Sequence, residues 1–194
     1  MLSGAMMSSQ PNIYMSPKEY LALERTADFK SEYFDGEIFA LAGGSENHNL
    51  IATNITGLIH YHLRRGLCKV FNSDMKVRIF TAKKYVYPDA TVVCGERKFD
   101  DEYKDAVLNP VLLVEVLSDS TAAYDRGGKF QAYKQLESFK EYILVSQDEY
   151  VIEQYVRKDE HNWSYTDAVG KESSIYSPTI DCTLSLSDVY EKTT

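Results

Sequence analysis

The sequence lacks long apolar runs and contains little glycine or proline. No stretch of about 18 consecutive apolar residues occurs in the 194-residue chain, so no transmembrane helix is predicted. There are only 10 glycines and 5 prolines, and 44% of the residues are hydrophobic, which excludes collagen-like and disordered classes. The N-terminus has neither a charged n-region nor an apolar core, so it does not resemble a secretory signal. We therefore expect a globular chain, with residues 1–15 as a disordered tail or expression remnant and residues 16–192 as a single domain.

Cysteine and positive charge are also scarce. The three cysteines, Cys68, Cys94 and Cys182, are widely separated and form no CxxC pair or metal-ligand spacing. They are predicted to be small core residues of a protein in a reducing cytoplasm. The 21 Lys and Arg residues are outnumbered by 29 Asp and Glu residues, and the net charge of −8 argues against a broad phosphate-binding surface. A local basic site remains compatible with that charge.

Hydrophobic periodicity predicts an α/β sandwich, in which a central mixed β-sheet is flanked by α-helices. The nearly unbroken apolar run 111–117 is typical of a central strand covered on both faces. Capping signals at Ser16-Pro17-Lys18-Glu19 indicate a helix start. The expected helices are 16–27, 43–65, 128–137 and 184–190, and 118–127 is expected to be a polar connection. The other expected strands are 33–35, 37–42, 68–71, 75–80, 85–94, 142–146, 151–157 and 163–166.

Three charged side chains occupy positions that favour burial. Glu115 lies in the middle of the apolar run, where an unpaired carboxylate costs several kcal/mol. Asp89 follows Pro88 inside a β-rich run, and a proline there marks an edge or a bulge. On a helical wheel, Lys129 falls near the middle of the apolar face of the 128–137 helix. We therefore expect the lysine to face the sheet that carries the two acids.

This trio has two interpretations. Glu115 and Lys129 form a plain buried ion pair while Asp89 is a turn residue, or the two carboxylates hold a divalent metal ion such as Mg²⁺. Such an ion lowers the pKa of a bound water and stabilises charge on a scissile phosphate. The lysine would then orient the attacking water or stabilise the transition state. The residues alone leave both interpretations open.

An ordered series of short motifs surrounds these residues. In order they are Tyr33-Phe34-Asp35-Gly36-Glu37-Ile38, Asn47-His48, Phe71-Asn72-Ser73-Asp74-Met75, Tyr87-Pro88-Asp89, Val114-Glu115-Val116-Leu117-Ser118, Ser120-Thr121, Tyr124-Asp125-Arg126, Lys129-Phe130, Tyr133 and Glu141-Tyr142-Ile143-Leu144-Val145. Together they resemble the Uma-two family of restriction-endonuclease-like proteins, in the PD-(D/E)XK nuclease superfamily, over residues 16–190. The resemblance implies a restriction-endonuclease-like fold and a DNA endonuclease that uses Mg²⁺ or Mn²⁺ to hydrolyse phosphodiester bonds. It also implies a homodimer, since nucleases of this fold often cut two strands with two subunits.

The resemblance assigns roles to the central residues. Asp89 would be the acid of the PD half-motif and a metal ligand, Glu115 the second acidic ligand, and the carbonyl of Val116 a third ligand. The superfamily lysine would fall at position 117, where this chain has Leu117. The narrower family resemblance moves that role to Lys129 on the following helix, in agreement with the helical wheel.

Four other polar residues are weaker candidates. Glu32 resembles an additional acid that many such nucleases carry. His48 lies in the first turn of the long helix. Its functional interpretation is contact with a substrate phosphate or transfer of a proton, and its structural interpretation is a helix cap or a packing residue. Asp125 and Arg126 are expected to be structural, with Asp125 as a helix cap.

Arg64, Arg65 and Lys69 form the best basic cluster. They would either contact a DNA backbone or lie on a solvated helix end, where cations are favourable in any case.

A catalytically inactive nuclease-fold module that acts through protein or nucleic-acid binding is the main alternative. Carboxylates of Asp89 and Glu115 within about 5 Å of one point would favour the metal site. A direct Glu115–Lys129 contact with a distant Asp89 would favour the module. A third class, a small-molecule phosphoesterase, would require a closed pocket.

Overall fold

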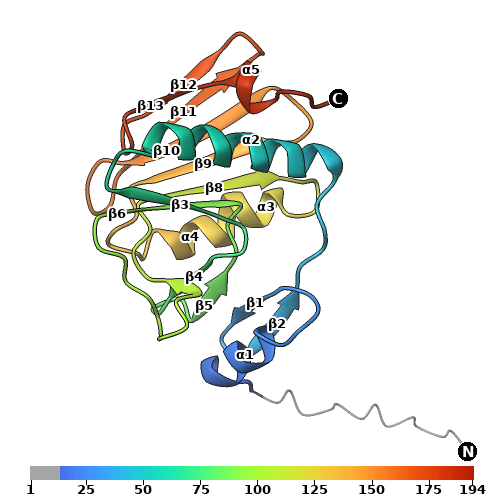
Figure 1. Ribbon diagram of the computed structural model, residues 1–194, viewed down its shortest axis with the longest axis vertical. Helices are drawn as coiled ribbons and strands as arrows, with labels where there is room; N and C mark the ends of the chain where they lie inside the picture. The colour runs from blue at the N-terminus through green and yellow to red at the C-terminus, as the bar shows by residue number, and fades with distance from the viewer. Residues whose placement is uncertain (1–13) are drawn as a thin grey trace, which may run out of the picture.

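A six-stranded mixed sheet forms the centre of the computed structural model, which describes residues 14–194 (Figure 1). Its strands, in spatial order, are β11 (Trp163–Val169), β10 (Val151–Arg157), β9 (Glu141–Ser146), β8 (Leu112–Leu117), β6 (Ala90–Cys94) and β3 (Cys68–Asn72). β8 and β9 are parallel, and every other neighbouring pair is antiparallel. All six residues of β8 are buried, which confirms the prediction of a central strand at the apolar run.

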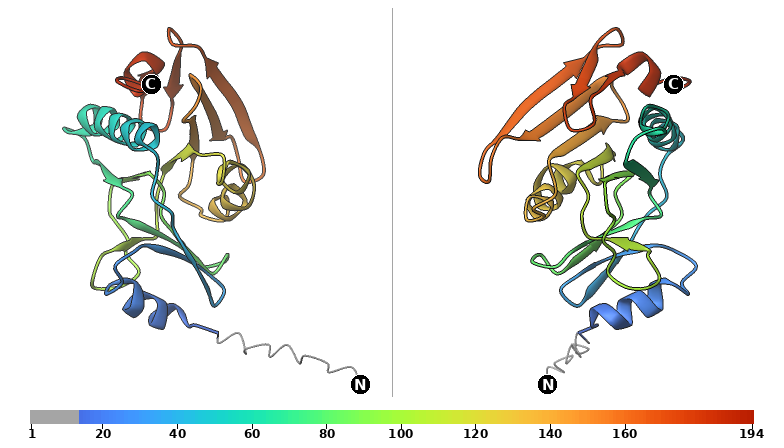
Figure 2. Two further views of the ribbon diagram at one scale, coloured as in Figure 1. Left: turned by 90° about the vertical axis from the view of Figure 1, so that its right-hand side faces the viewer. Right: turned by 60° about the vertical axis from the view of Figure 1, so that its left-hand side comes forward.

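Helices cover both faces of this sheet, as the two side views show (Figure 2). One face packs against α2 (Glu46–Leu63) through Ile51, Ile55 and Ile59, which recur at helical spacing and are fully buried. The other face packs against a helical segment, residues 122–133, made of α3 (Ala122–Tyr124), the π-helical turn η1 (Asp125–Lys129) and α4 (Phe130–Tyr133). The predicted α/β class with a mixed sheet and flanking helices is confirmed.

The helical segment departs from the prediction at both ends. The sequence placed a polar connection at 118–127 and a helix at 128–137, whereas the helix begins at Ala122 and ends at Tyr133. Gly127 and Gly128 weaken a helix by propensity alone. They lie inside one here because Lys129 and Phe130 are buried against the sheet, and tertiary packing outweighs propensity.

A second sheet of five strands lies beside the first. Its order is β2 (Glu37–Ala40), β1 (Ser31–Phe34), β5 (Lys84–Val86), β4 (Lys76–Ile79) and β7 (Ala106–Val107). The predicted single run 85–94 is wrong, because β5 belongs to this sheet and β6 to the six-stranded one. Pro88, which has no backbone N–H to donate, lies where the chain passes from the five-stranded sheet to the six-stranded sheet. Asp89 follows it, immediately before the first residue of β6.

The two ends of the chain add smaller elements. α1 (Pro17–Glu24) begins with the predicted capping box, in which the Ser16 hydroxyl accepts from the Glu19 amide. The predicted tail reached residue 15. Residues 1–13 lie outside the described part, but Met15 donates its amide to the Gly36 carbonyl at 3.1 Å and so belongs to the fold. The sequence did not predict the C-terminal hairpin of β12 (Ser174–Ser177) and β13 (Cys182–Ser185), which precedes α5 (Leu186–Val189).

The prediction for the cysteines is partly wrong. Cys68 and Cys94 lie directly opposite each other on β3 and β6 and form a disulfide, whereas Cys182 is a buried free thiol as expected. Their separation of 26 residues does not predict the disulfide, because the pairing of the two cysteines follows from the register of β3 and β6. Across residues 14–194, no helix combines the length and the apolarity needed to cross a bilayer.

Candidate active site

The two acids singled out by the sequence meet on neighbouring strands, Asp89 just before β6 and Glu115 within β8. In the antiparallel pair of β6 and β8, Ala90 lies opposite Val114. Continuing this register by one residue sets Asp89 opposite Glu115, on the same face, where side chains are close neighbours. The Val116 amide donates to Asp89 Oδ2 at 2.7 Å and fixes the aspartate against β8. Asp89 is thus a neighbour of Glu115, contrary to what the plain ion-pair interpretation requires.

Lys129 lies at the centre of a group of acids. Its Nζ is 3.0 Å from Glu115 Oε1, 3.3 Å from Glu32 Oε1 and 3.6 Å from Asp125 Oδ1. The lysine is only 5% exposed and Glu115 only 3%. η1 and α4 project Lys129 and Tyr133 toward β8, where the Tyr133 hydroxyl donates to Glu115 Oε1 at 2.7 Å. The helical wheel placed Lys129 on this inward face, and its burial in the structure confirms that placement.

Burial and charge set the protonation of this group. Burial raises the pKa of Glu115 well above its usual range, against the opposing effect of Lys129. Burial also raises the pKa of Asp125. Burial alone would lower the pKa of Lys129, but Glu115, Glu32 and Asp125 outweigh it and raise that pKa well above its usual value. Lys129 is therefore an ammonium at neutral pH, among more carboxyl groups than it can neutralise.

Glu32 reaches the site from the second sheet. It lies on β1, is 7% exposed and accepts a hydrogen bond from the Tyr87 amide at 3.2 Å. The Tyr124 hydroxyl lies 3.5 Å from the other carboxylate oxygen of Glu32. The same hydroxyl accepts a hydrogen bond from Lys84 Nζ at 3.2 Å. The weakest of the predicted acids is therefore held in the same cluster by contacts from Tyr87, Tyr124 and Lys129.

His48 holds the other side of Asp89. Its Nε2 lies 3.1 Å from Asp89 Oδ1, and this hydrogen bond raises the pKa of His48 against the effect of burial. Ser45 caps α2 by accepting from the His48 amide at 3.1 Å. A Cβ on Gly44 would come within 2.6 Å of the imidazole ring, so the glycine lets the ring lie close to the chain. The ring contacts the predicted metal ligand directly, which makes it more than a cap.

Asp125 is a site residue that sequence reasoning assigned only a capping role. It is 3% exposed and lies one helical turn before Lys129 on the same face. The spacing of four residues was visible in the sequence, but the helix was predicted to start after Asp125. Arg126 is structural as expected, since it pairs with Glu153 on β10 at 3.0 Å.

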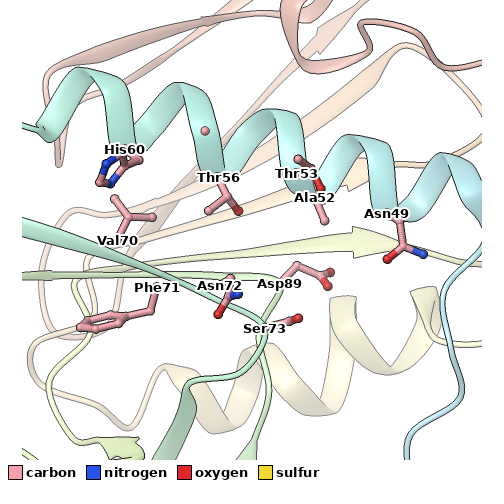
Figure 3. A pocket seen from close by; sticks show the side chains of 11 residues that line it. Asn49, Ala52, Thr53, Thr56, His60, Val70, Phe71, Asn72, Ser73 and Asp89 are labelled. Atoms are coloured by element: carbon pink, nitrogen blue, oxygen red, sulfur yellow. The ribbon is translucent and has the colours of Figure 1, made fainter.

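These side chains line a cavity of about 470 Å³. Its wall includes Asp89, Glu115, Val116, Lys129 and His48, so the principal candidates share one space. The cavity is open to solvent at the junction of the two sheets and the N-terminal end of α2. A second hollow adjoins it along α2 and β3 and also has Asp89 in its wall (Figure 3).

The donor set limits how a metal could bind. Among the residues from 14 onward, no three His, Cys, Asp or Glu side chains are grouped so as to hold a metal ion. An ion between Asp89 and Glu115 would take two carboxylates and complete its shell with a main-chain oxygen, water and substrate. Mg²⁺ prefers such an arrangement, because it retains several waters and binds through one or two carboxylates plus substrate phosphates. The excess of carboxyl groups over Lys129 also fits a divalent cation.

The basic cluster lies elsewhere. The Arg64 guanidinium lies 3.7 Å from the centre of the Tyr61 ring and lines a hollow formed with β13. Arg65 is exposed after α2, and Lys69 lies on β3 opposite Val93. The walls of the cavity around Asp89 contain none of these three side chains.

Known proteins are similar to this chain in sequence and in fold. The Uma2 family model, described as "Putative restriction endonuclease", matches residues 17–187. The uncharacterized protein slr1290 of Synechocystis sp. is 42% identical over 155 residues, covering 80% of each chain. The uncharacterized protein sll1609 of the same organism is 37% identical over 161 residues, covering 83% of this chain and 91% of that protein.

A solved structure supports the fold assignment. The crystal structure of "a putative nuclease belonging to DUF820" from Anabaena variabilis has a TM-score of 0.72 and 17% identity, over 89% of this chain and 96% of that one. At that identity the likeness shows a shared fold. The family match covers nearly all of the chain, confirms the resemblance seen in the motifs, and shows that this protein belongs to the Uma2 family.

Proposed function

We propose that this protein is a divalent-metal-dependent endonuclease that hydrolyses phosphodiester bonds in DNA. The observation that carries the proposal is the meeting of Asp89, Glu115 and Lys129 in one open cavity, from three different segments of the chain. Two acids and a lysine are the groups that metal-assisted phosphodiester hydrolysis needs. The Uma2 family description points to the same chemistry.

Asp89, Glu115 and the Val116 carbonyl would hold Mg²⁺ or Mn²⁺. When bound, the ion would supply a water of lowered pKa and a positive charge at the scissile phosphate. His48 and the Val116 amide already hold the two Asp89 oxygens, so the aspartate needs little reorganisation to bind a cation. Tyr133 orients Glu115 in the same way.

Lys129 acts as a cation in this proposal. Because its neighbours raise its pKa, it keeps its proton at neutral pH and cannot accept one from water. Its role is to donate a hydrogen bond to the attacking water or to the phosphate oxygen on which charge develops. Glu32 and Asp125 hold the ammonium in place from the other sides.

The inactive module is the second candidate, and one observation favours it. Lys129 contacts Glu115 at 3.0 Å, and Tyr133 donates to the same carboxylate oxygen, which would satisfy a purely structural ion pair. A structural pair does not account for Asp89, which the register sets beside Glu115 and which two groups hold at the cavity wall.

A cytoplasmic homodimer with residues 16–192 as one domain completes the proposal. Each copy would supply one active site. β2 is an edge strand whose four residues are all exposed, including Phe39 at 50%, and an exposed apolar edge suits contact with a second copy. Sedimentation of the protein would test this part separately.

Plasmid nicking tests the proposed activity. Supercoiled DNA is incubated with the wild type, Asp89→Asn or Lys129→Ala, in Mg²⁺, in Mn²⁺ and in EDTA. We expect metal-dependent nicking that each variant lowers by about a hundredfold or more. Asp167→Asn is the matched control, because it makes the same change on exposed β11 of the same sheet. Nicking that persists in both site variants, or none by the wild type in either metal, would overturn the proposal.

A further inference from the structure

A second hollow continues the candidate active site along α2. It has a volume of about 600 Å³ and lies between α2 and the end of β3 (Figure 3). The two hollows share Asn49, Ala52, Ser73 and Asp89, so they are parts of one continuous groove. A strand whose phosphate lies at Asp89 would therefore have its next nucleotides in the second hollow.

One edge of α2 forms a wall of this second hollow. Asn49, Thr53, Thr56 and His60 recur at steps of three or four residues, so they lie in a row along the helix. Figure 3 shows Asn49 and His60 at the two ends of that row. The twelve residues from Asn49 to His60 span about 16 Å, which is the length of about four to five stacked nucleotides.

The chemistry of the hollow suits bases and sugars better than phosphates. Its wall contains no Lys or Arg, and its one acid is Asp89 at the junction with the active site. Asn72, Ser73 and the threonines of α2 can donate and accept hydrogen bonds, and His60 supplies an exposed ring at the far end of the hollow. A duplex presents its phosphates outward and is held by Lys and Arg, which are absent from this wall. An unpaired strand presents base edges and ring faces, which amide, hydroxyl and aromatic groups recognise.

We infer that the hollow along α2 binds unpaired nucleotides next to the scissile phosphate. The substrate class is then DNA with a single-stranded segment, such as a gap, flap or bubble, and intact duplex is a poorer ligand. This inference rests on the proposed nuclease function for the position of the scissile phosphate. The net charge of −8 agrees with it, because an unpaired segment needs a smaller basic footprint than an extended duplex.

Fluorescence anisotropy in EDTA at near-physiological salt tests the inference without any cleavage. The probes are a blunt duplex and the same duplex with a gap of about five unpaired nucleotides, each labelled at one end. We expect the gapped probe to bind about tenfold tighter or more, the scale of one or two base contacts. Thr56→Phe, which fills the hollow, and His60→Ala, which removes an exposed ring from its end, should each reduce that preference. Tyr61→Ala is the matched control, since Tyr61 lines hollows on the other side of α2.

The outcomes separate this inference from the proposed activity. Equal binding of the two probes, no binding of the gapped probe, or a preference unchanged in both groove variants would overturn the inference. Asp89-dependent nicking of plasmid could still be present in that case. A groove-dependent preference without any nicking would support the binding site and contradict the nuclease. His60→Ala keeps the test decisive if Thr56→Phe fails to fold.

Discussion

Removing the buried ammonium of Lys129 should destabilise the protein in a pH-dependent way. Lys129→Met keeps the length of the side chain but leaves Glu32, Glu115 and Asp125 without their shared cation. Removing one partner of a buried pair costs about 3–5 kcal/mol, because the remaining charge is neither solvated nor compensated. We expect a loss in this range in the free energy of unfolding at pH 7.

The sign of the pH dependence follows from the carboxyl groups. Burial already raises the pKa of Glu115, and loss of the lysine raises it further. A carboxyl whose pKa is higher in the folded state than in the unfolded state costs stability once the pH exceeds its unfolded value. The loss caused by Lys129→Met should therefore be largest at neutral pH and shrink as the pH falls toward about 4.

Urea denaturation at several pH values, followed by Trp163 fluorescence and circular dichroism, measures this loss. Arg126→Met is the matched control, because Arg126 lies on the same helical segment but is 43% exposed and pairs with Glu153 alone. Its cost should stay below about 1 kcal/mol. Adding Glu115→Gln to Lys129→Met should recover part of the stability. A loss for Lys129→Met that is no larger than the control, or that does not change with pH, would refute this account of the buried charges.

Three further predictions concern Asp105, the disulfide and His48. Hydrogen bonds from Arg25 lower the pKa of Asp105 to about 2. The contribution of Asp105 to the free energy of unfolding is therefore present above pH about 4 and is lost as the pH falls toward 2. Asp105→Asn should cost about 1–2 kcal/mol at pH 7 and remove that part of the acid sensitivity in urea titrations. Cys68→Ser should cost about 3 kcal/mol by releasing the loop closed by Cys94, and thiol titration of the unreduced, denatured wild type should find one free thiol. His48→Gln should lower plasmid nicking by about tenfold with little change in melting temperature, since the ring orients the metal-binding aspartate; unchanged nicking would limit the histidine to packing.

The central strand and the inward lysine could be predicted because each follows from a local pattern. The apolar run around Glu115 has no polar face, so it fits only a strand covered on both sides. Lys129 shares a helical face with Tyr133, and that relation holds wherever the helix begins. Both predictions depend on periodicity over a few residues, which the sequence displays directly.

The remaining features depend on contacts between distant segments. Pro88 could be recognised as an interruption, but not as the crossing between two sheets. Asp125 was assigned a capping role because the helix was predicted to begin at residue 128. Only packing on the sheet explains why the helical segment begins earlier and includes both Gly127 and Gly128. The pairing of Cys68 with Cys94 is likewise a matter of strand register, which the spacing does not encode.

Metal binding tests the central claim, a shared metal site of Asp89 and Glu115, most directly. Calorimetric titration of the metal-free protein with Mn²⁺ should show one site per chain, with binding lost in Asp89→Asn and retained in Asp167→Asn. Glu115→Gln should also lose the site, because both carboxylates are ligands. An isotherm without binding in the wild type, or the same affinity in Asp89→Asn and Glu115→Gln as in the wild type, would contradict the claim.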